Sequence, residues 1–232
     1  MNLYIEGNIG AGKTTLTTIL GQILPSASTT LEPVDEWMSF RDSDGQSLLD
    51  LFYGNIKRYS YLFQSVAFRT RMKSLEKTLA TSEAKYNLFE RSVYADRHCF
   101  AQNCYEGGNM SQIEWNDYTQ WFDWLCQTFR LEDKINGFIY VKTSPEVAYQ
   151  RLIRRNRHGE ESIPLEYLKA LAMKHDQMMG HLSTKYKVLV IDGDRDFKNN
   201  PEIQKDIVQK IAEMWPKEES KQETASCESS KP

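Results

Sequence analysis

Residues 7–15 form the segment whose residue types and spacing point most directly to chemistry. They follow the apolar run Leu3-Tyr4-Ile5, and apolar residues three and four apart behind them predict a helix. In such a strand, loop and helix, backbone N–H groups and the positive end of the helix dipole face bound phosphates. A lysine adds positive charge, and a threonine hydroxyl can bind Mg²⁺. This predicted phosphate-binding loop reads Gly7-Asn8-Ile9-Gly10-Ala11-Gly12-Lys13-Thr14-Thr15, a complete G-x-x-x-x-G-K-[ST] pattern.

Acidic and basic side chains also follow two other apolar runs. Glu32 comes after the second run, and Glu90 and Arg91 come directly after the third. Ligands of open α/β sheets bind beyond the carboxyl ends of the strands, so these side chains are candidate site residues. Glu90 is a candidate Mg²⁺ ligand, together with Thr14. The alternatives are a polar strand end before a proline for Glu32, and an ion pair that caps the next helix for Glu90 and Arg91.

An arginine-rich helix is predicted after the fourth apolar run. Arg151 and Arg155 lie four residues apart on one helical face, so both can reach the same anion above the phosphate-binding loop. Arg157 is a third candidate, whereas Arg154 lies one position off this face and is expected to face solvent. A basic helical face, or one that binds RNA, is the alternative.

The elements that must position these residues alternate between strands and helices. Apolar runs of strand length predict an α/β fold with a five-stranded parallel sheet covered by helices on both faces. The loop at 7–15 makes this a P-loop NTPase-type fold, in which the arginine-rich helix is expected to form a lid above the loop. The weakest strand signal is the second. The predicted strands are 3–5, 29–31, 86–89, 138–141 and 188–191; the predicted helices are 13–22, 46–79 with a break around Tyr59, 92–104, 112–130, 145–157, 164–178 and 201–214.

Length and composition limit the domain organisation and the partners. The chain has 232 residues, 40% of them apolar, which suits one compact domain over residues 1–215, with the lid at about 151–163. Residues 216–232 are almost entirely polar and are predicted to be a disordered tail. A net charge of -3 argues against a general nucleic-acid or membrane binder and favours small-molecule partners. The first strand begins at Asn2, so a cytoplasmic protein without a targeting peptide is expected, provided that the chain is not a trimmed form.

Four motifs together resemble the deoxyribonucleoside kinase family. They are the loop at 7–15, Glu32-Pro33-Val34 with Trp37, Glu90-Arg91-Ser92, and the arginine-rich segment that runs into 163–168. The family includes deoxycytidine and deoxyguanosine kinases, the mitochondrial type of thymidine kinase and the insect multisubstrate enzyme. The resemblance covers residues 2 to about 197. It implies Mg²⁺-dependent transfer of the γ-phosphate of ATP, or another nucleoside triphosphate, to the 5′-hydroxyl of a deoxynucleoside in nucleotide salvage.

The resemblance also implies residue roles. Glu32 matches the general base, and Arg91 matches an arginine that contacts both this carboxylate and the substrate oxygen. Lys13, Arg151 and Arg155 would neutralise the moving phosphoryl group with Arg157, while Asp196 and Phe197 would contact the donor nucleobase. Tyr53 and Glu160 match residues that hold the 3′-hydroxyl, and Gln64 matches the side chain that reads the base. The implied nucleoside site is Glu32, Val34, Trp37, Leu49, Phe52, Tyr53, Phe63, Gln64, Arg71, Arg91, Asp96, Phe100 and Glu160.

Arg71 and Asp96 indicate the base preference. They align with an arginine and an aspartate beside the base in deoxycytidine and deoxyguanosine kinases, where thymidine-preferring relatives have apolar or small residues. We therefore expect deoxycytidine or purine deoxynucleosides as substrates and thymidine as a poor one. A thymidine-preferring or multisubstrate kinase is the alternative.

Other functional classes fit the sequence less well. A nucleoside monophosphate kinase would share the loop and the sheet but lack the Glu32 and Glu90 motifs. A switch GTPase would need an N-K-x-D segment, which the sequence lacks. A non-catalytic binding protein would be expected to have lost Glu32 or Lys13. Family members generally form homodimers through helices, and the aromatic segment 115–129 fits such an interface or core packing.

Overall fold

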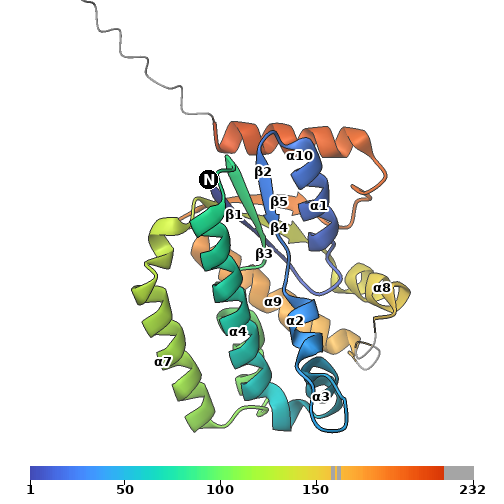
Figure 1. Cartoon of the computed structure of the whole chain (residues 1–232). Helices are drawn as coiled ribbons and strands as arrows, with labels where there is room; N and C mark the ends of the chain where they lie inside the picture. The colour runs from blue at the N-terminus through green and yellow to red at the C-terminus, as the bar shows by residue number, and fades with distance from the viewer. Residues whose placement is uncertain (158–159, 161–162, 217–232) are drawn as a thin grey trace, which may run out of the picture.

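Five parallel strands form a single sheet at the centre of the protein in the computed structural model (Figure 1). The structure describes residues 1–157, 160 and 163–216, so residues 217–232 of the predicted tail and residues 158, 159, 161 and 162 of the predicted lid lie outside the described residues. The strand order is β2-β3-β1-β4-β5, which confirms the predicted parallel sheet. The strands are β1 (Asn2–Glu6), β2 (Ala27–Thr30), β3 (Tyr86–Glu90), β4 (Gly137–Lys142) and β5 (Lys187–Asp192).

Helices cover both faces of the sheet because successive side chains of a strand point to opposite faces. Leu3 and Ile5 of β1 pack into a core with α1 (Lys13–Ile23) and α10 (Pro201–Met214). Tyr4 points to the other face, into a larger core with α4 (Ile56–Thr81) and α9 (Leu165–Leu182). Figure 1 shows α1 and α10 on one side of the strands and α4 and α9 on the other.

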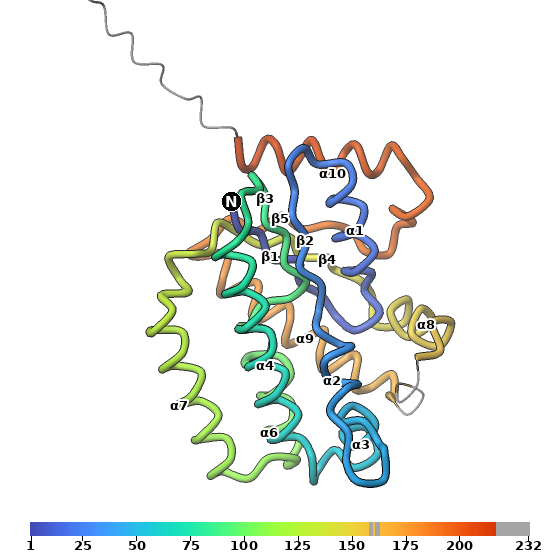
Figure 2. Tube along the Cα trace, viewed as in Figure 1, coloured from blue at the N-terminus to red at the C-terminus, as the bar shows by residue number. Residues whose placement is uncertain are grey.

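The remaining helices extend the second layer or border the carboxyl edge of the sheet. Figure 2 shows α7 alongside α4 at the outer side of the molecule, with α8 at the opposite side. These elements are α2 (Val34–Ser39), α3 (Leu48–Gly54), α5 (Val93–Ala95), the π-helix η1 (Asp96–Ala101), α6 (Gln102–Glu106), α7 (Gln112–Thr128), the short 3₁₀ helix η2 (Leu131–Lys134) and α8 (Pro145–Arg155).

Four local features differ from the sequence prediction. The second strand is Ala27–Thr30 instead of 29–31, and it is an edge strand without a buried residue, so it carries no apolar signal. The break in the long helix falls at Asn55 instead of Tyr59, because the Asn55 side chain accepts a hydrogen bond from Arg58 N–H and caps α4. The region predicted as one helix over 92–104 consists of α5, η1 and α6. Helix α2 was not predicted.

Candidate active site

The phosphate-binding loop joins β1 to α1 at the carboxyl edge of the sheet. Gly10 and Gly12 have φ angles of 76° and 99°, which favour glycine. A Cβ at Gly10 would overlap the carbonyl oxygen of Ala148, and one at Gly12 would lie 2.9 Å from the Phe197 ring. The loop therefore needs glycine both for its turn and for close contact with α8 and with the segment after β5.

Lys13 lies buried in this loop, where its Nζ donates to the carbonyl oxygen of Asn8 at 2.9 Å. Burial and the nearby Arg91 guanidinium lower the pKa of Lys13 to about 8. A bound phosphate would favour the protonated form, so anion binding and the charge of Lys13 reinforce each other.

Thr14 and Glu90 meet at the start of α1. The β1–β3 register pairs Ile5 with Glu90, so the ends of the two strands lie side by side. Thr14 Oγ1 donates to Glu90 Oε1 at 2.7 Å, and both residues line the same cavity. One hydroxyl and one carboxylate fit Mg²⁺, which usually takes its other ligands from phosphates and water. The described part of the chain contains no group of three or more His, Cys, Asp or Glu that could hold a metal ion by itself.

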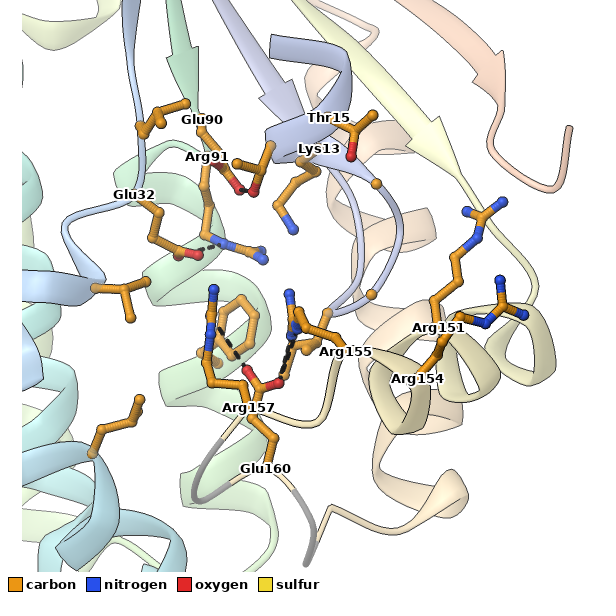
Figure 3. Close-up of a pocket in the computed structure, with 18 of the residues that line it drawn as sticks. Lys13, Thr15, Glu32, Glu90, Arg91, Arg151, Arg154, Arg155, Arg157 and Glu160 are labelled. Carbon is orange, nitrogen blue, oxygen red and sulfur yellow. Dashed lines mark hydrogen bonds and ion pairs between the residues drawn. The ribbon is translucent and has the colours of Figure 1, made fainter. Parts of the chain in front are cut away.

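Glu32 lies between two arginines. Its Oε1 accepts hydrogen bonds from Arg91 Nε at 3.0 Å and from Arg71 Nη2 at 2.8 Å (the contact with Arg91 is drawn in Figure 3). Burial alone would raise the pKa of Glu32, but the positive charges of Arg91 and Arg71 outweigh burial and hold this pKa well below its usual value. Glu32 is therefore ionised across the physiological pH range and can accept a proton.

Arg71 connects Glu32 to Asp96. Its Nε and Nη2 donate to the two carboxylate oxygens of Asp96 at 2.7 and 3.2 Å, and its Nη1 donates to the carbonyl oxygen of Glu90 at 3.0 Å. Burial raises the pKa of Asp96 and outweighs the opposing effect of Arg71. The sequence predicted Arg71 and Asp96 as a pair beside the base, but it did not predict that Arg71 also holds Glu32.

One cavity of about 1140 Å³ joins the phosphate-binding loop to an aromatic pocket. Arg71 lies behind this cavity, adjacent to Asp96 and Glu32, and does not line it. Trp37 and Phe52 pack against Phe63, with ring centroids 5.4 and 4.4 Å apart. The predicted site residues that line the cavity are Ile9, Gly10, Gly12, Lys13, Thr14, Thr15, Glu32, Val34, Trp37, Leu49, Phe52, Tyr53, Phe63, Gln64, Glu90, Arg91, Asp96, Phe100, Arg151, Arg155, Arg157, Glu160, Asp196 and Phe197.

The lid arginines point in two directions (Figure 3). Arg151 Nη1 donates to the carbonyl oxygens of Ala11 and Gly193 at 3.2 and 2.7 Å, so it lies against the phosphate-binding loop. Arg155 Nη2 donates to Glu160 at 2.6 Å, and Arg157 Nη1 donates to the same carboxylate at 3.4 Å. Arg151 and Arg155 therefore do not share an anion in this structure. Arg154 is exposed, as predicted, but it also lines the cavity beside Arg151.

Two buried groups near the site were missed by sequence reasoning. Glu6 ends β1 and has no exposed surface, and His175 lies fully buried in α9. An acid immediately before the loop could have been noticed, because it ends an otherwise apolar strand. His175 had no such signal, since it is more than 80 residues from the Arg91 side chain that it contacts.

A parallel sheet with a phosphate-binding loop after its central strand, and with a carboxylate and arginines around one cavity, defines a phosphotransferase of the P-loop class. The sequence model of the family named "Deoxynucleoside kinase" matches residues 3–215, so this chain belongs to that family.

Individual relatives are similar over most of their length. The chain is 35% identical to "Deoxycytidine kinase" of Rattus norvegicus, over 91% of this chain and 90% of the relative. It is 36% identical to "Probable deoxycytidine kinase FPV151" of Fowlpox virus, over 90% of this chain and 86% of the relative. It is 31% identical to "Deoxyguanosine kinase, mitochondrial" of Xenopus laevis, over 85% of this chain and 83% of the relative. Among the described helices, none is long and apolar enough to cross a bilayer.

Proposed function

We propose that this protein transfers the γ-phosphate of ATP, or of another nucleoside triphosphate, to the 5′-hydroxyl of deoxycytidine and purine deoxynucleosides, and that it uses thymidine poorly. The class of reaction follows from the family. The names of the relatives support the base preference, since they include deoxycytidine and deoxyguanosine kinases.

The Arg71–Asp96 pair is the observation that carries the base preference. Both carboxylate oxygens of Asp96 accept from Arg71, and Asp96 lines the cavity with Gln64 and Phe100. The Asp96 carboxylate, which Arg71 holds in place from behind the cavity, can accept from the amino group of cytosine or adenine. Thymine offers only an oxygen and a methyl group at the corresponding edge. Asp96 therefore favours cytosine and adenine over thymine, while deoxyguanosine is included because of the names of the relatives.

The reacting atoms would lie between Glu32 and the phosphate-binding loop. Glu32 would accept the proton of the 5′-hydroxyl, while Arg91 would orient Glu32 and donate to the oxygen under attack. Lys13 and Arg151, which lie on two sides of the loop, would neutralise the charge of the γ-phosphoryl group. Arg155 would join them if the lid rearranges, because in this structure it is held by Glu160.

Thr14 and Glu90 would hold Mg²⁺, directly or through water. When bound, the ion would neutralise the β- and γ-phosphate oxygens. Asp196 and Phe197 would contact the donor nucleobase, which the closeness of Phe197 to Gly12 supports. Tyr53 and Glu160 would hold the 3′-hydroxyl.

We also propose that the protein is a homodimer that pairs through α7. This helix exposes Ile113, Trp121 and Trp124, whose exposed fractions are 78%, 52% and 55%. Their spacing of eight and three residues puts them on one side of the helix. Exposed tryptophans on one helix face are typical of protein interfaces.

The test of the substrate assignment is an initial-rate comparison of deoxycytidine, deoxyadenosine, deoxyguanosine and thymidine with ATP and Mg²⁺. We expect turnover of the first three and little of thymidine. Thymidine dominance would contradict the base preference but keep the class of enzyme. Phosphorylation of deoxynucleoside monophosphates alone would contradict the substrate class. A Lys13→Met preparation controls for contaminating kinases.

A further inference from the structure

Arg91 has a strained backbone conformation at the centre of the site. Its φ angle is 69°, and it is one of four non-glycine residues with positive φ in the described ranges. The other three, Ser26, Arg130 and Asn156, do not line the cavity, whereas Arg91 does. A non-glycine residue keeps such a conformation only where the surrounding structure holds it. The neighbours of Arg91 must therefore hold this conformation.

Glu6 holds the backbone next to Arg91. The N–H of Arg91 donates to the carbonyl oxygen of Ile5 at 2.9 Å, and the N–H of Ser92 donates to Glu6 Oε1 at 2.7 Å. Glu6 has no exposed surface. Burial raises its pKa, and a neutral carboxyl group can still accept this hydrogen bond through its carbonyl oxygen. What the contact needs first is an acceptor oxygen at this position.

His175 holds the side chain of Arg91 from the opposite direction. Its Nδ1 lies 2.8 Å from the carbonyl oxygen of Leu171, so Nδ1 carries the proton and donates. Nε2 is then an acceptor, and Arg91 Nη1 lies 3.2 Å from it. Burial and the positive charge of Arg91 lower the pKa of His175 to about 3, so the ring stays neutral.

The other contacts of the guanidinium complete this arrangement. Arg91 Nε donates to Glu32, and the guanidinium carbon lies 4.4 Å from the centre of the Phe100 ring. The Phe100 and His175 rings meet edge to face, with centroids 5.9 Å apart. Arg91 Nη2 has no hydrogen-bond partner in the part of the chain that the structure describes, so it is available for a ligand.

We propose that Glu6 and His175 are positioning residues, which hold Arg91 in its left-handed conformation with Nε on Glu32 and Nη2 free for a substrate oxygen. Neither touches the substrate, and both act through Arg91. The inference rests on the proposed role of Arg91 in the reaction.

The chain allows one disruptive and one conservative change at each position. His175→Phe keeps a buried ring against Phe100 but removes the acceptor for Arg91, whereas His175→Gln keeps an acceptor near the position of Nε2. Glu6→Leu removes the acceptor for Ser92 N–H, whereas Glu6→Gln keeps it. In metal sites, removing an outer partner that orients a ligand typically costs about 10- to 100-fold in affinity or activity, and Arg91 is oriented in the same way. We expect kcat losses of that size for the disruptive pair, and kcat values close to wild type for the conservative pair.

A double-mutant cycle with Arg91→Ala separates positioning from general damage. If His175 acts through Arg91, then His175→Phe should lower kcat in the wild-type background but not in the Arg91→Ala background. The Kd of deoxycytidine, measured calorimetrically, should change much less than kcat. If His175→Phe does not fold, His175→Asn replaces it, because Asn can still donate to Leu171 but its oxygen does not reach Arg91.

Three results would overturn the inference. The first is an equal fold-loss of kcat on His175→Phe in the wild-type and Arg91→Ala backgrounds. The second is a kcat close to wild type for both His175→Phe and Glu6→Leu. In both cases a large loss of kcat in the Arg91→Ala variant leaves the proposed function intact. The third result, full activity of Arg91→Ala, would refute the proposed role of Arg91 and the inference with it.

Discussion

Glu32 is ionised because two arginines hold its pKa low, and the same arginines weaken it as a base. This is compatible with phosphoryl transfer through a loose transition state, in which the hydroxyl needs orientation and a late proton acceptor more than a strong base. The Arg91 and Arg71 contacts thus fix where the proton goes. They do not supply the driving force for its removal.

Replacing Glu32 by Gln keeps the size of the side chain and removes the proton acceptor. We expect kcat to fall by about 10²- to 10⁴-fold, the usual contribution of a general base, while the Kd of deoxycytidine changes little. Steady-state kinetics and calorimetry measure the two effects. Glu36→Gln, which alters a carboxylate of α2 that pairs only loosely with Lys73 at 3.9 Å, is the matched control. A kcat of Glu32→Gln within threefold of wild type would show that Glu32 is not the base.

Asp96 satisfies a buried guanidinium as well as lining the base pocket. Asp96→Ala would leave the Nε of Arg71 without its partner, and breaking a buried ion pair typically lowers the free energy of unfolding by about 3–5 kcal/mol. Because Arg71 keeps Glu32 and the Glu90 carbonyl, we expect a loss near the lower end of this range. The ratio of kcat/KM for deoxycytidine over thymidine should also fall.

Urea unfolding and initial rates measure both consequences of Asp96→Ala. Asp133→Ala is the control, because Asp133 pairs with Arg130 at the surface and such pairs contribute about 1 kcal/mol or less. If the ratio of kcat/KM for deoxycytidine over thymidine is unchanged in Asp96→Ala, the proposed role of Asp96 in base recognition is contradicted.

At the level of elements, strand β4 begins with Gly137, which packs directly under Trp215 at the end of α10. A Cβ at Gly137 would overlap the ring of Trp215 and lie 2.8 Å from the carbonyl oxygen of Lys187 in β5. Trp215 is itself held by a hydrogen bond from Nε1 to the carbonyl oxygen of Asn136 at 3.0 Å. Gly137→Val would therefore displace Trp215 or separate β4 from β5.

We expect Gly137→Val to lower the free energy of unfolding by about 1–3 kcal/mol, as overpacking of a core does. Gly180→Ala in α9 is the matched control, because a Cβ there meets no atom within 4 Å. That change should stabilise the protein by up to about 1 kcal/mol through helix propensity. Urea unfolding of both variants measures the difference, and equal stabilities would contradict the packing argument.

The elements show which features a sequence can predict. Apolar runs predicted β1, β3 and β4 because these strands are buried on both faces, and they predicted the edge strand β5 because its sequence is apolar although only Leu189 and Ile191 are buried. The loop motif predicted the turn into α1. The edge strand β2 was misplaced because its Ala-Ser-Thr-Thr sequence is only partly buried. Asn55 was missed because a capping side chain leaves no periodic signal. The contact of Glu6 with Ser92 N–H and that of His175 with Arg91 could not be predicted, because they depend on how β1, β3 and α9 meet.

The whole molecule should carry a pH dependence from His175. Its pKa is about 3 in the folded protein and close to the ordinary 6.5 when unfolded. Since the unfolded chain binds the extra proton between these values, the stability contributed by neutral His175 is complete above pH 6.5 and is lost as pH falls toward 3.

His175→Gln removes the titrating imidazole and leaves the other titratable groups in place. The difference in the free energy of unfolding between the wild type and this variant therefore isolates the contribution of His175. The stability advantage of the wild type over His175→Gln should shrink by about 2 kcal/mol from about pH 7 to pH 5, at roughly 1.4 kcal/mol per pH unit below 6.5. Urea unfolding at both pH values measures the change. An advantage that stays constant would contradict a neutral, buried His175.

The last prediction concerns assembly. In α7, Tyr118 and Phe122 are buried against the rest of the protein, while Trp121 and Trp124 are exposed. The ring centroids of the two tryptophans lie 5.4 Å apart. The Tyr61 hydroxyl of α4 donates to Asp117, so α4, which runs beside α7 (Figure 2), anchors α7 from one side. The two tryptophans stay exposed. If the helix face that carries them forms the proposed homodimer, Trp121→Glu with Trp124→Glu would bury two carboxylates in each half of the interface and prevent pairing.

Sedimentation velocity should then show a dimer for the wild type and a monomer for the double variant. The matched control is Met173→Glu, because Met173 is similarly exposed, at 62%, but lies on α9. Since the cavity is lined by residues of one chain, the monomeric variant should keep measurable kinase activity. The apparent free energy of unfolding should depend on protein concentration for the wild-type dimer and not for the monomeric variant. A wild-type monomer would refute the proposed assembly, and a dimeric double variant would move the interface away from α7.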